Sequence, residues 1–241
     1  METMKAMILA AGLGSRLKPW TNHHPKALAM VNGKCLLHRN IEYLQQSGIY
    51  DVIINVHHFA DQVTSAIEKN NGWGSNITIS DERDAVLETG GGLQKAGWYF
   101  ATETDFVVMN VDILTDMDLP AMITQHTTVK PLATLAVSKR QTSRYFLFDD
   151  KHILSGWRNA QTNEEKIVRN TEPLFQKAFS GIHVISTAIF SLMTQQGKFS
   201  MVDVYLSLAK QHPITFYDHS GSKLIDVGKP ESLQKAVAAF S

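Results

Sequence analysis

Residues 9–28, LAAGLGSRLKPWTNHHPKAL, constrain the fold of this 241-residue chain more than any other segment. A short apolar run that is typical of a buried strand stops at Gly12 and Gly14, and Arg16 and Lys26 follow. Glycine lets backbone N–H groups approach an anion without a side chain in the way. Concave runs of such groups bind phosphate, and nearby cations add charge. The segment therefore predicts a phosphate-binding loop at the end of a strand.

Two common phosphate-binding designs do not fit this loop. The chain has no run of Gly, four residues and Gly-Lys-Ser/Thr, which the Walker pattern requires. The dinucleotide fingerprint wants a third glycine where this chain has Leu17. Pro19 and Pro25 also argue against a long helix directly after the loop. A dinucleotide oxidoreductase is therefore the weakest alternative.

Strand-like and helix-like patterns alternate through the first half of the chain. The pattern predicts strands at residues 5–11, 51–56, 76–80 and 106–109, helices at 36–46 and 59–69, and a glycine loop at Gly90 that opens a further helix. Such alternation predicts an α/β fold with a Rossmann-like, doubly wound, mostly parallel sheet. Ligands of these sheets lie at the carboxyl ends of the strands. Gly12, Asn110 and Asp112 all follow predicted strand ends, so we expect them to meet.

The second half changes to shorter elements. Strand-like runs occur at 133–137, 145–148, 152–157, 167–169 and 179–185, and helices are expected at 187–193, 202–211 and 230–240. No linker, repeat or low-complexity segment separates the halves. We therefore expect one domain, 1–241, in which a mixed sheet extends the parallel one.

Composition limits the partners and the location. Lys plus Arg and Asp plus Glu both number 23, so bulk binding to nucleic acid or to an anionic membrane is not expected. The single cysteine fits a reducing compartment. No stretch approaches the roughly 20 apolar residues of a membrane span, and no leader pattern is present. A cytoplasmic location is the expectation.

Two aspartates are the candidate metal ligands. Asp112 ends the run VVMNVD and Asp226 ends the run LID, and both runs read as strands. Mg²⁺ prefers oxygen ligands and usually takes one or two carboxylates together with substrate phosphates and water. The pair therefore predicts a Mg²⁺ site. The competing interpretation is that each aspartate caps a turn or helix.

The opening loop and several later segments together resemble the sugar-1-phosphate nucleotidyltransferases. The resemblance rests on AAGLGSRLKPW with HPKAL, ETGGGL at 88–93, MNVD at 109–112, FSGIHV at 179–184 and IDVGKPE at 225–231. These enzymes join a nucleoside triphosphate to a sugar 1-phosphate and release pyrophosphate. The resemblance implies the nucleotide-diphospho-sugar transferase fold, with a nucleotide-binding half at 1–115 and a sugar-binding half at 116–241. Among subfamilies, the chain looks most similar to the N-acetylmuramate 1-phosphate uridylyltransferases and then to the mannose-1-phosphate guanylyltransferases.

The resemblance also implies roles for particular residues. Arg16 would hold the triphosphate, Lys26 would hold the sugar phosphate against the α-phosphate, and Asp112 and Asp226 would bind Mg²⁺. The expected nucleotide-binding set is Ala10, Ala11, Gly12, Leu13, Gly14, Ser15, Arg16, Thr89, Gly90, Gly91 and Asn110. The expected sugar-binding set is Glu88, Asp112, Asn170, Glu172, Ser180 and Gly181. Glu88 is equally well explained as a helix cap.

Two departures from the family pattern affect these assignments. Val111 replaces the glycine that usually separates the Asn and Asp of the MNVD segment, which would shift the backbone near the base or ribose. Glucose-type relatives carry a Glu-Lys-Pro motif, and the corresponding region here, Val168-Arg169-Asn170-Thr171-Glu172-Pro173, has no lysine. The motifs therefore leave the sugar and the nucleobase open.

The resulting expectation is a Mg²⁺-dependent transfer from UTP to N-acetylmuramate 1-phosphate, in peptidoglycan recycling. The alternatives within the class are mannose- or heptose-1-phosphate guanylyltransferase and phosphocholine cytidylyltransferase. A non-catalytic nucleotide-sugar-binding subunit is the alternative from another class, and retention of both cations and both aspartates argues against it. The sequence does not fix the oligomeric state, and a monomer is the working expectation.

Overall fold

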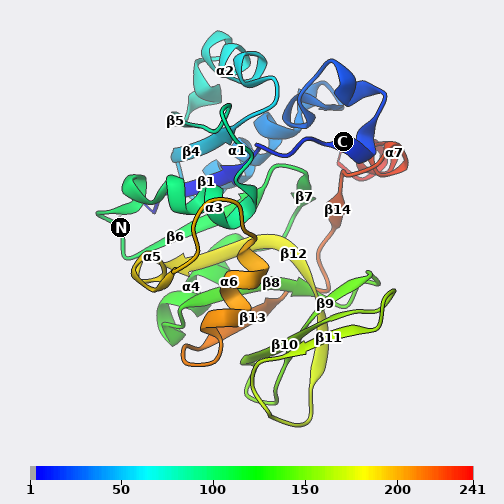
Figure 1. The fold of residues 1–241 in the computed structure, drawn as a ribbon. Coiled ribbons are helices and arrows are strands. Elements are labelled where there is room, and N and C mark those ends of the chain that lie inside the picture. The colour runs from blue at the N-terminus through cyan, green and yellow to red at the C-terminus, as the bar shows by residue number, and fades with distance from the viewer. Residues whose placement is uncertain (1–3, 241) are drawn as a thin grey trace.

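The computed structural model describes residues 4–240, and its centre is a parallel sheet. Four strands lie in the order β5-β4-β1-β6 (Figure 1). Their bounds are β1 Ala6–Leu9, β4 Asp51–Val56, β5 Asn76–Asp81 and β6 Asp105–Asn110. Ile8 pairs with Ile54 of β4 on one side and with Met109 of β6 on the other, and all three contacts between these strands are parallel. The predicted parallel sheet is confirmed.

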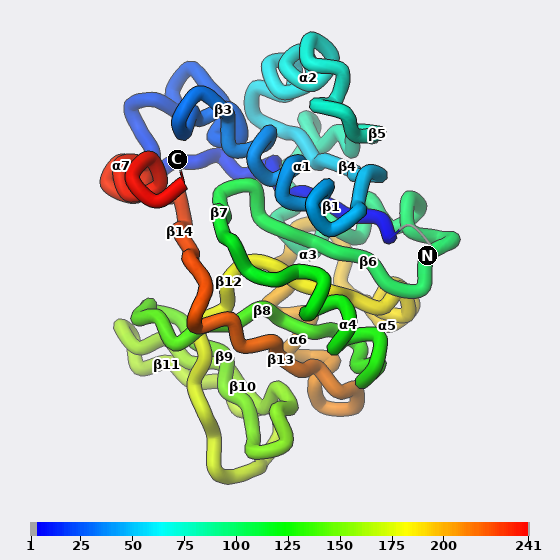
Figure 2. The backbone as a smooth tube through the Cα atoms, turned by 180° about the vertical axis from the view of Figure 1, so that it is seen from behind, coloured from blue at the N-terminus to red at the C-terminus, as the bar shows by residue number. Residues whose placement is uncertain are grey.

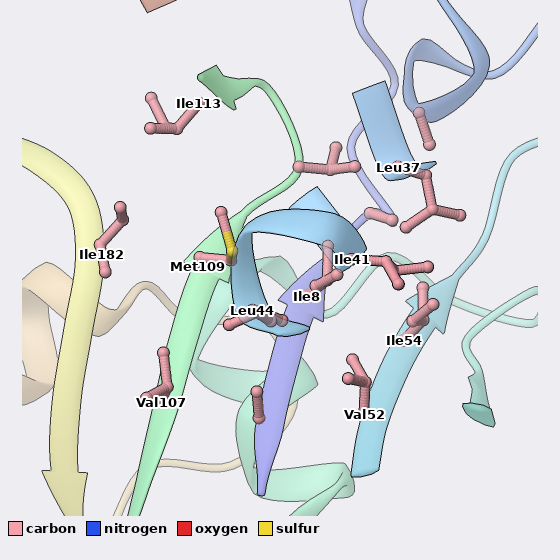
Figure 3. Packing of buried hydrophobic residues seen from close by; sticks show 14 of the residues in the cluster. Ile8, Leu37, Ile41, Leu44, Val52, Ile54, Val107, Met109, Ile113 and Ile182 are labelled. Atoms are coloured by element: carbon pink, nitrogen blue, oxygen red, sulfur yellow. The ribbon is translucent and has the colours of Figure 1, made fainter. Parts of the chain in front are cut away.

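Apolar side chains on both faces of this sheet explain why helices cover both. On one face Leu37, Ile41 and Leu44 of helix α1 (Leu36–Gln46) pack with Ile8 and Val107 (Figure 3). Their spacing puts them on one side of the helix. Helices α2 (Ala60–Lys69) and α4 (Leu119–Val129) join this face, and α3 (Glu88–Lys95), α5 (Ile189–Leu192) and α6 (Met201–Leu208) join the opposite one. The sheet is doubly wound, as predicted.

A long strand joins the parallel sheet to the second half of the chain. Strand β12 (Phe175–Ser186) is antiparallel to β6, to β8 (Ala133–Ser138) and, through its first residues, to β9 (Arg144–Phe148). Strand β13 (Ile214–Asp218) lies parallel to β8. Strands β10 (Leu154–Asn159) and β11 (Glu164–Ile167) complete an antiparallel extension that projects from the body of the molecule (Figure 1). The predicted mixed-sheet extension is confirmed.

The C-terminal segment returns to the N-terminal loop. Strand β14 (Leu224–Asp226) pairs antiparallel with β7 (Ile113–Thr115), and helix α7 (Pro230–Ala239) lies beside the hairpin of β2 (Met30–Val31) and β3 (Lys34–Cys35) (Figure 2). Leu17, Leu36, Val227 and Ala236 share a small apolar cluster there. This return brings the C-terminal segment to the loop that follows β1.

Several expectations were wrong in detail. The glycines at 90–92 do not form a loop before a helix, because α3 already begins at Glu88. Strand β14 is only half-buried, and β6 ends at Asn110, so Asp112 lies in the turn that follows. The pattern missed β7, α4 and β13. The short helical turns at Ser15–Leu17, Trp20–Asn22 and Lys26–Leu28 agree with the expectation that no long helix follows the loop.

Across residues 4–240 no helix is both long and apolar enough to cross a membrane.

Candidate functional site

The parallel strands β1, β4 and β6 end at one edge of the sheet, and a cavity of about 430 Å³ lies there. It is lined by Leu9, Ala11, Gly12, Gly14, Ser15, Arg16, Lys26, Asn55, Val86, Glu88, Thr89, Asn110, Val111, Asp112, Ser200 and Gly228. Twelve of these lining residues are polar or glycine. They come from segments that are distant in the sequence, so only the fold brings them together. The cavity is where open α/β sheets bind their ligands.

The loop after β1 is held from both sides. The amide oxygen of Asn55 accepts hydrogen bonds from the backbone N–H groups of Ala10 at 2.7 Å and Ala11 at 3.3 Å. Gly14 adopts φ 60°, and its carbonyl oxygen accepts from the hydroxyl of Thr21 at 3.0 Å. Ala10 and Ala11 therefore use their donors within the protein. Among the described residues the N–H groups of Gly12 and Gly14 find no acceptor, so these donors remain for a ligand.

Arg16 lies against the C-terminal segment. A methyl group added at Gly228 would come within 2.8 Å of both a guanidinium nitrogen of Arg16 and the Oδ1 atom of Asp226. Only glycine at this position leaves room for that arrangement. Arg16 is exposed to the cavity and can turn its planar fork toward phosphate oxygens.

Lys26 is a buried cation that contacts the carboxylate of Asp112. Its side chain retains only 10% of its exposure, and that of Asp112 retains 18%. The pair spans the cavity from the third helical turn of the loop to the turn after β6. A free ammonium group would be costly to bury, so the carboxylate partner stabilises it there.

Asp226 reaches the same place by β-pairing. Strand β14 pairs with β7, and the N–H of Val227 donates to the carbonyl oxygen of Asp112 at 2.8 Å. The Oδ1 atom of Asp226 is buried without a hydrogen-bond partner. Burial, and next the charge of Asp112, raise the pKa of Asp226. Two carboxylates that repel each other, one with an unpartnered oxygen, form a site that a divalent cation would neutralise.

The donor set fits Mg²⁺. Both aspartates offer hard oxygen atoms, which Mg²⁺ prefers. Within residues 4–240 no group of three or more His, Cys, Asp or Glu side chains could enclose a metal ion. A cation here would therefore need substrate phosphates and water to complete its coordination, which is the usual arrangement for Mg²⁺.

The glycine segment of α3 serves packing. A Cβ atom at Gly90 would lie 2.4 Å from the ring of Phe199, and one at Gly91 would lie 2.1 Å from the carbonyl oxygen of Gly197. Neither glycine lines the cavity, which differs from the expectation that they face the base. Their neighbours Thr89 and Glu88 do line it, and the Thr89 hydroxyl oxygen accepts from the N–H of Met201 at 2.9 Å.

Glu88 is the first residue of α3 and has φ 60°. A non-glycine residue rarely adopts this conformation, and such strain often marks a functional position. Its side chain is not a helix cap and instead lies 3.6 Å from the ammonium of Lys198. The capping interpretation of Glu88 is therefore wrong.

The residues expected on the sugar side do not all meet at the cavity. Gly181 has φ 75° and space for no Cβ, and it packs beside Asn110, a residue of the expected nucleotide-binding set that lines the cavity. Ser180 is fully buried and shares a hydrogen bond of 2.8 Å with Nε2 of His219. Asn170 and Glu172 are exposed between β11 and β12 and do not line the cavity. Leu13 and Ser15 of the loop are exposed, and only Ser15 lines the cavity.

Sequence reasoning missed Asn55, Glu82 and Gly228. Asn55 is 2% exposed, and its amide nitrogen donates to a carboxylate oxygen of Glu82 at 2.8 Å. A polar residue inside the otherwise apolar run VIINV was the signal that could have found it. Burial raises the pKa of Glu82, whose second carboxylate oxygen has no partner. Gly228 belongs to the quoted segment IDVGKPE, but its role depends on where Arg16 lies.

Comparison with known proteins agrees with this geometry. N-acetylmuramate alpha-1-phosphate uridylyltransferase of Caulobacter vibrioides is 45% identical over 93 residues, a match that spans only 38% of this chain and 38% of that relative. D-glycero-alpha-D-manno-heptose 1-phosphate guanylyltransferase of Aneurinibacillus thermoaerophilus is 28% identical over 97% of this chain and 96% of the relative. The crystal structure of HddC from Yersinia pseudotuberculosis complexed with GMP-PN shares the fold, with a TM-score of 0.79, 22% identity, and coverage of 99% of this chain and 100% of that one.

The sequence model that describes the nucleotidyl transferase family matches residues 5–240, almost the full length. The chain belongs to the nucleotidyl transferase family.

Proposed function

We propose that the protein transfers a nucleotidyl group from a nucleoside triphosphate to a sugar 1-phosphate and releases pyrophosphate. One observation carries the proposal: three distant segments meet at one cavity, the first with free loop N–H donors, Arg16 and Lys26, the second with Asp112, and the third with Gly228, beside which Asp226 lies. The sugar phosphate oxygen would attack the α-phosphorus while the bond to pyrophosphate breaks. Positioning and charge stabilisation supply most of the catalysis in such transfers.

Each charged group has a task that its place supports. The N–H groups of Gly12 and Gly14, with Arg16, would bind the leaving pyrophosphate. Lys26 would leave Asp112 and bind the phosphate of the incoming sugar, which requires only a short movement of a flexible side chain. Mg²⁺ held by Asp112 and Asp226 would supply positive charge to the phosphate oxygens.

We further propose UTP and N-acetylmuramate 1-phosphate as the substrates. The local identity of 45% to the Caulobacter enzyme supports this choice. The guanylyltransferase alternative is supported by a match along almost the whole chain and by a fold neighbour complexed with GMP-PN. Both alternatives predict the same chemistry and differ in the base and the sugar.

A pyrophosphate-release screen tests the proposal. The four nucleoside triphosphates are each mixed with N-acetylmuramate, N-acetylglucosamine, glucose, mannose and heptose 1-phosphates, and with phosphocholine, with and without Mg²⁺. We expect release with UTP and N-acetylmuramate 1-phosphate, and only with Mg²⁺. Release with GTP and a heptose phosphate would select the alternative, and no release with any pair would refute the proposed activity.

The Asp226→Asn variant ties the activity to the site. The substitution removes a charge but keeps the shape, so the variant should stay folded and lose at least about 10³-fold in turnover. Asp150→Asn, at an exposed position outside the cavity lining, is the matched control. Full activity of Asp226→Asn would exclude this residue from metal binding.

A further inference from the structure

The loops after β8 and β13 lie at the same edge of the sheet as the cavity. Strands β6 and β8 are both antiparallel to β12, with Met109 opposite Ile182 and Ser138 opposite Ala178. Their carboxyl ends therefore point the same way. Neighbouring strands are about 4.8 Å apart, so β8 lies roughly 10 Å from β6 across the sheet, and the register displaces its end further along β12.

A second cavity, of about 330 Å³, occupies this place. It is lined by Ser138, Lys139, Arg140, Ser220, Ser222 and Leu224. The lining holds two cations and three hydroxyl groups and contains no carboxylate. Leu224 belongs to β14, the strand that ends at Asp226, so one short strand connects this cavity to the candidate metal site.

Two polar groups in this lining are buried without partners. One guanidinium nitrogen of Arg140 donates to the carbonyl oxygen of Phe179 at 2.8 Å, but Nε is buried and unpaired. The hydroxyl of Ser138, a residue that is 6% exposed, has no partner either. Leaving a buried donor unsatisfied costs about 1–3 kcal/mol. Such groups indicate a missing acceptor, and a guanidinium binds a carboxylate through two parallel hydrogen bonds.

No acid within the described part of the chain supplies that acceptor. Within residues 4–240 Arg140 forms no ion pair. Asp218, at the end of β13, is already paired with Lys177 at 2.6 Å and also accepts from the N–H of Ser220 at 3.0 Å. The charge of Arg140 acts on Asp226 and His219 without contacting either. The cavity therefore keeps an excess of positive charge.

We propose that Arg140, with Lys139 and Ser138, binds a carboxylate that the sugar carries in addition to its phosphate. This inference rests on the proposed nucleotidyl transfer and names the class of sugar that it prefers. N-acetylmuramate differs from N-acetylglucosamine by a lactyl ether that ends in a carboxylate. Arg140 would distinguish these two sugars, while Lys26 and Arg16 would bind the phosphates that both reactions share.

The test compares Arg140→Gln with the wild-type enzyme on these two sugar 1-phosphates. For N-acetylmuramate 1-phosphate we expect KM to rise at least about 30-fold, because a charge-assisted bidentate contact is lost. For N-acetylglucosamine 1-phosphate, kcat/KM, or Ki if the compound only competes, should stay within twofold. The KM for UTP should not change. Arg140→Lys keeps the charge without the fork and should give an intermediate KM.

Arg144→Gln is the matched control, because Arg144 is exposed on β9 and lies outside the cavity lining. An equal loss for both sugars in Arg140→Gln would overturn the proposal, and so would equal wild-type activity on the two sugars. These outcomes leave the nucleotidyl transfer itself standing.

Calorimetry with free N-acetylmuramate, which has no phosphate, tests the cavity even if no turnover is found. Wild-type protein should bind it and Arg140→Gln should not. Absence of binding to the wild type would reject the carboxylate site. Binding without any pyrophosphate release would instead reject the proposed activity, so the two failures are distinguishable.

Discussion

Two glycine-rich segments lie near the cavity, and they use glycine for opposite purposes. A Cβ atom at Gly12 would meet nothing within 4 Å, so this segment leaves open space beside free N–H donors. A Cβ atom at Gly90 or Gly91 would collide with Phe199 or Gly197. The first segment is available to a ligand, whereas the second lets α3 approach the chain that leads into α6. Glycine content alone does not distinguish these uses.

Asn55 and Glu82 lie between the two segments and together contact both. Asn55 accepts from the loop at Ala10 and Ala11, and its amide nitrogen and Glu82 occupy the space where Gly92 has no side chain. Packing of α3 is thereby connected to the shape of the loop. Four substitutions can break or sharpen the distinction between a ligand-facing and a packing-facing glycine segment.

Gly91→Ala should have the largest effect. The new methyl group would lie 2.1 Å from a backbone oxygen, which cannot move as a side chain does. We expect a loss of about 2–4 kcal/mol in the free energy of unfolding and a melting temperature lower by roughly 5–15 °C. Gly221→Ala, whose methyl group would meet nothing within 4 Å, is the control for calorimetry. An unchanged melting temperature would mean that the α3 glycines do not serve packing.

Asn55→Ala should weaken both segments at once. Two backbone N–H groups lose their acceptor, which costs about 1–3 kcal/mol of stability. The loosened loop should raise the KM for the nucleotide about tenfold, since small displacements in positioning groups are costly. Urea unfolding and steady-state kinetics measure the two effects. Asn76→Ala, at the exposed first residue of β5, is the matched control and should change neither.

Gly12→Ala should leave stability within about 0.5 kcal/mol, because the site is open and the backbone there does not require glycine. Its methyl group would occupy space that a phosphate needs, so nucleotide affinity should fall about tenfold. Titration calorimetry with UTP measures this change. If instead stability fell and affinity stayed the same, Gly12 would serve packing and not ligand binding.

Glu82→Gln should have the smallest effect, and one that depends on pH. Because burial raises the pKa of Glu82 in the folded state, its contribution to stability is full below the usual pKa of about 4.5 and is lost as pH rises through the folded value. The glutamine variant carries no such charge, so its stability relative to wild type should increase as pH rises above 4.5, by at most about 1.4 kcal/mol per pH unit. Denaturant unfolding between pH 4 and 8 measures it. A constant difference would show that Glu82 titrates normally.

Much of the parallel sheet could be predicted from the sequence, because buried strands such as β4 read as continuous apolar runs bounded by glycine or polar residues. The position of Gly12, Asn110 and Asp112 at one edge followed from the rule for parallel strands. Strand β14 and strand β7 were harder, because three-residue strands leave almost no periodic signal. Their pairing is a long-range contact, and it alone puts Asp226 beside Asp112.

The sugar side shows where sequence reasoning stops. Asn170 and Glu172 were chosen because they occupy a family motif, yet the fold exposes them away from both cavities. Arg140 has no motif around it, and its significance comes from an unpaired nitrogen that only packing creates. Ser180 was expected to contact the sugar, but its hydroxyl is hydrogen-bonded to His219, which is 39 residues away in the sequence.

Strand β12 belongs to the central sheet and to the projecting extension at once, through Ile182–Ser186 at one end and Phe175–Lys177 at the other. If the central sheet or the extension loses its pairing with β12, an edge of β12 is left unpaired. We therefore expect the two halves to unfold in one cooperative transition, despite their different topologies. A nucleotide at one end of the site and a sugar phosphate at the other should then raise the same melting temperature, each by an amount that grows with the ratio of its concentration to its Kd.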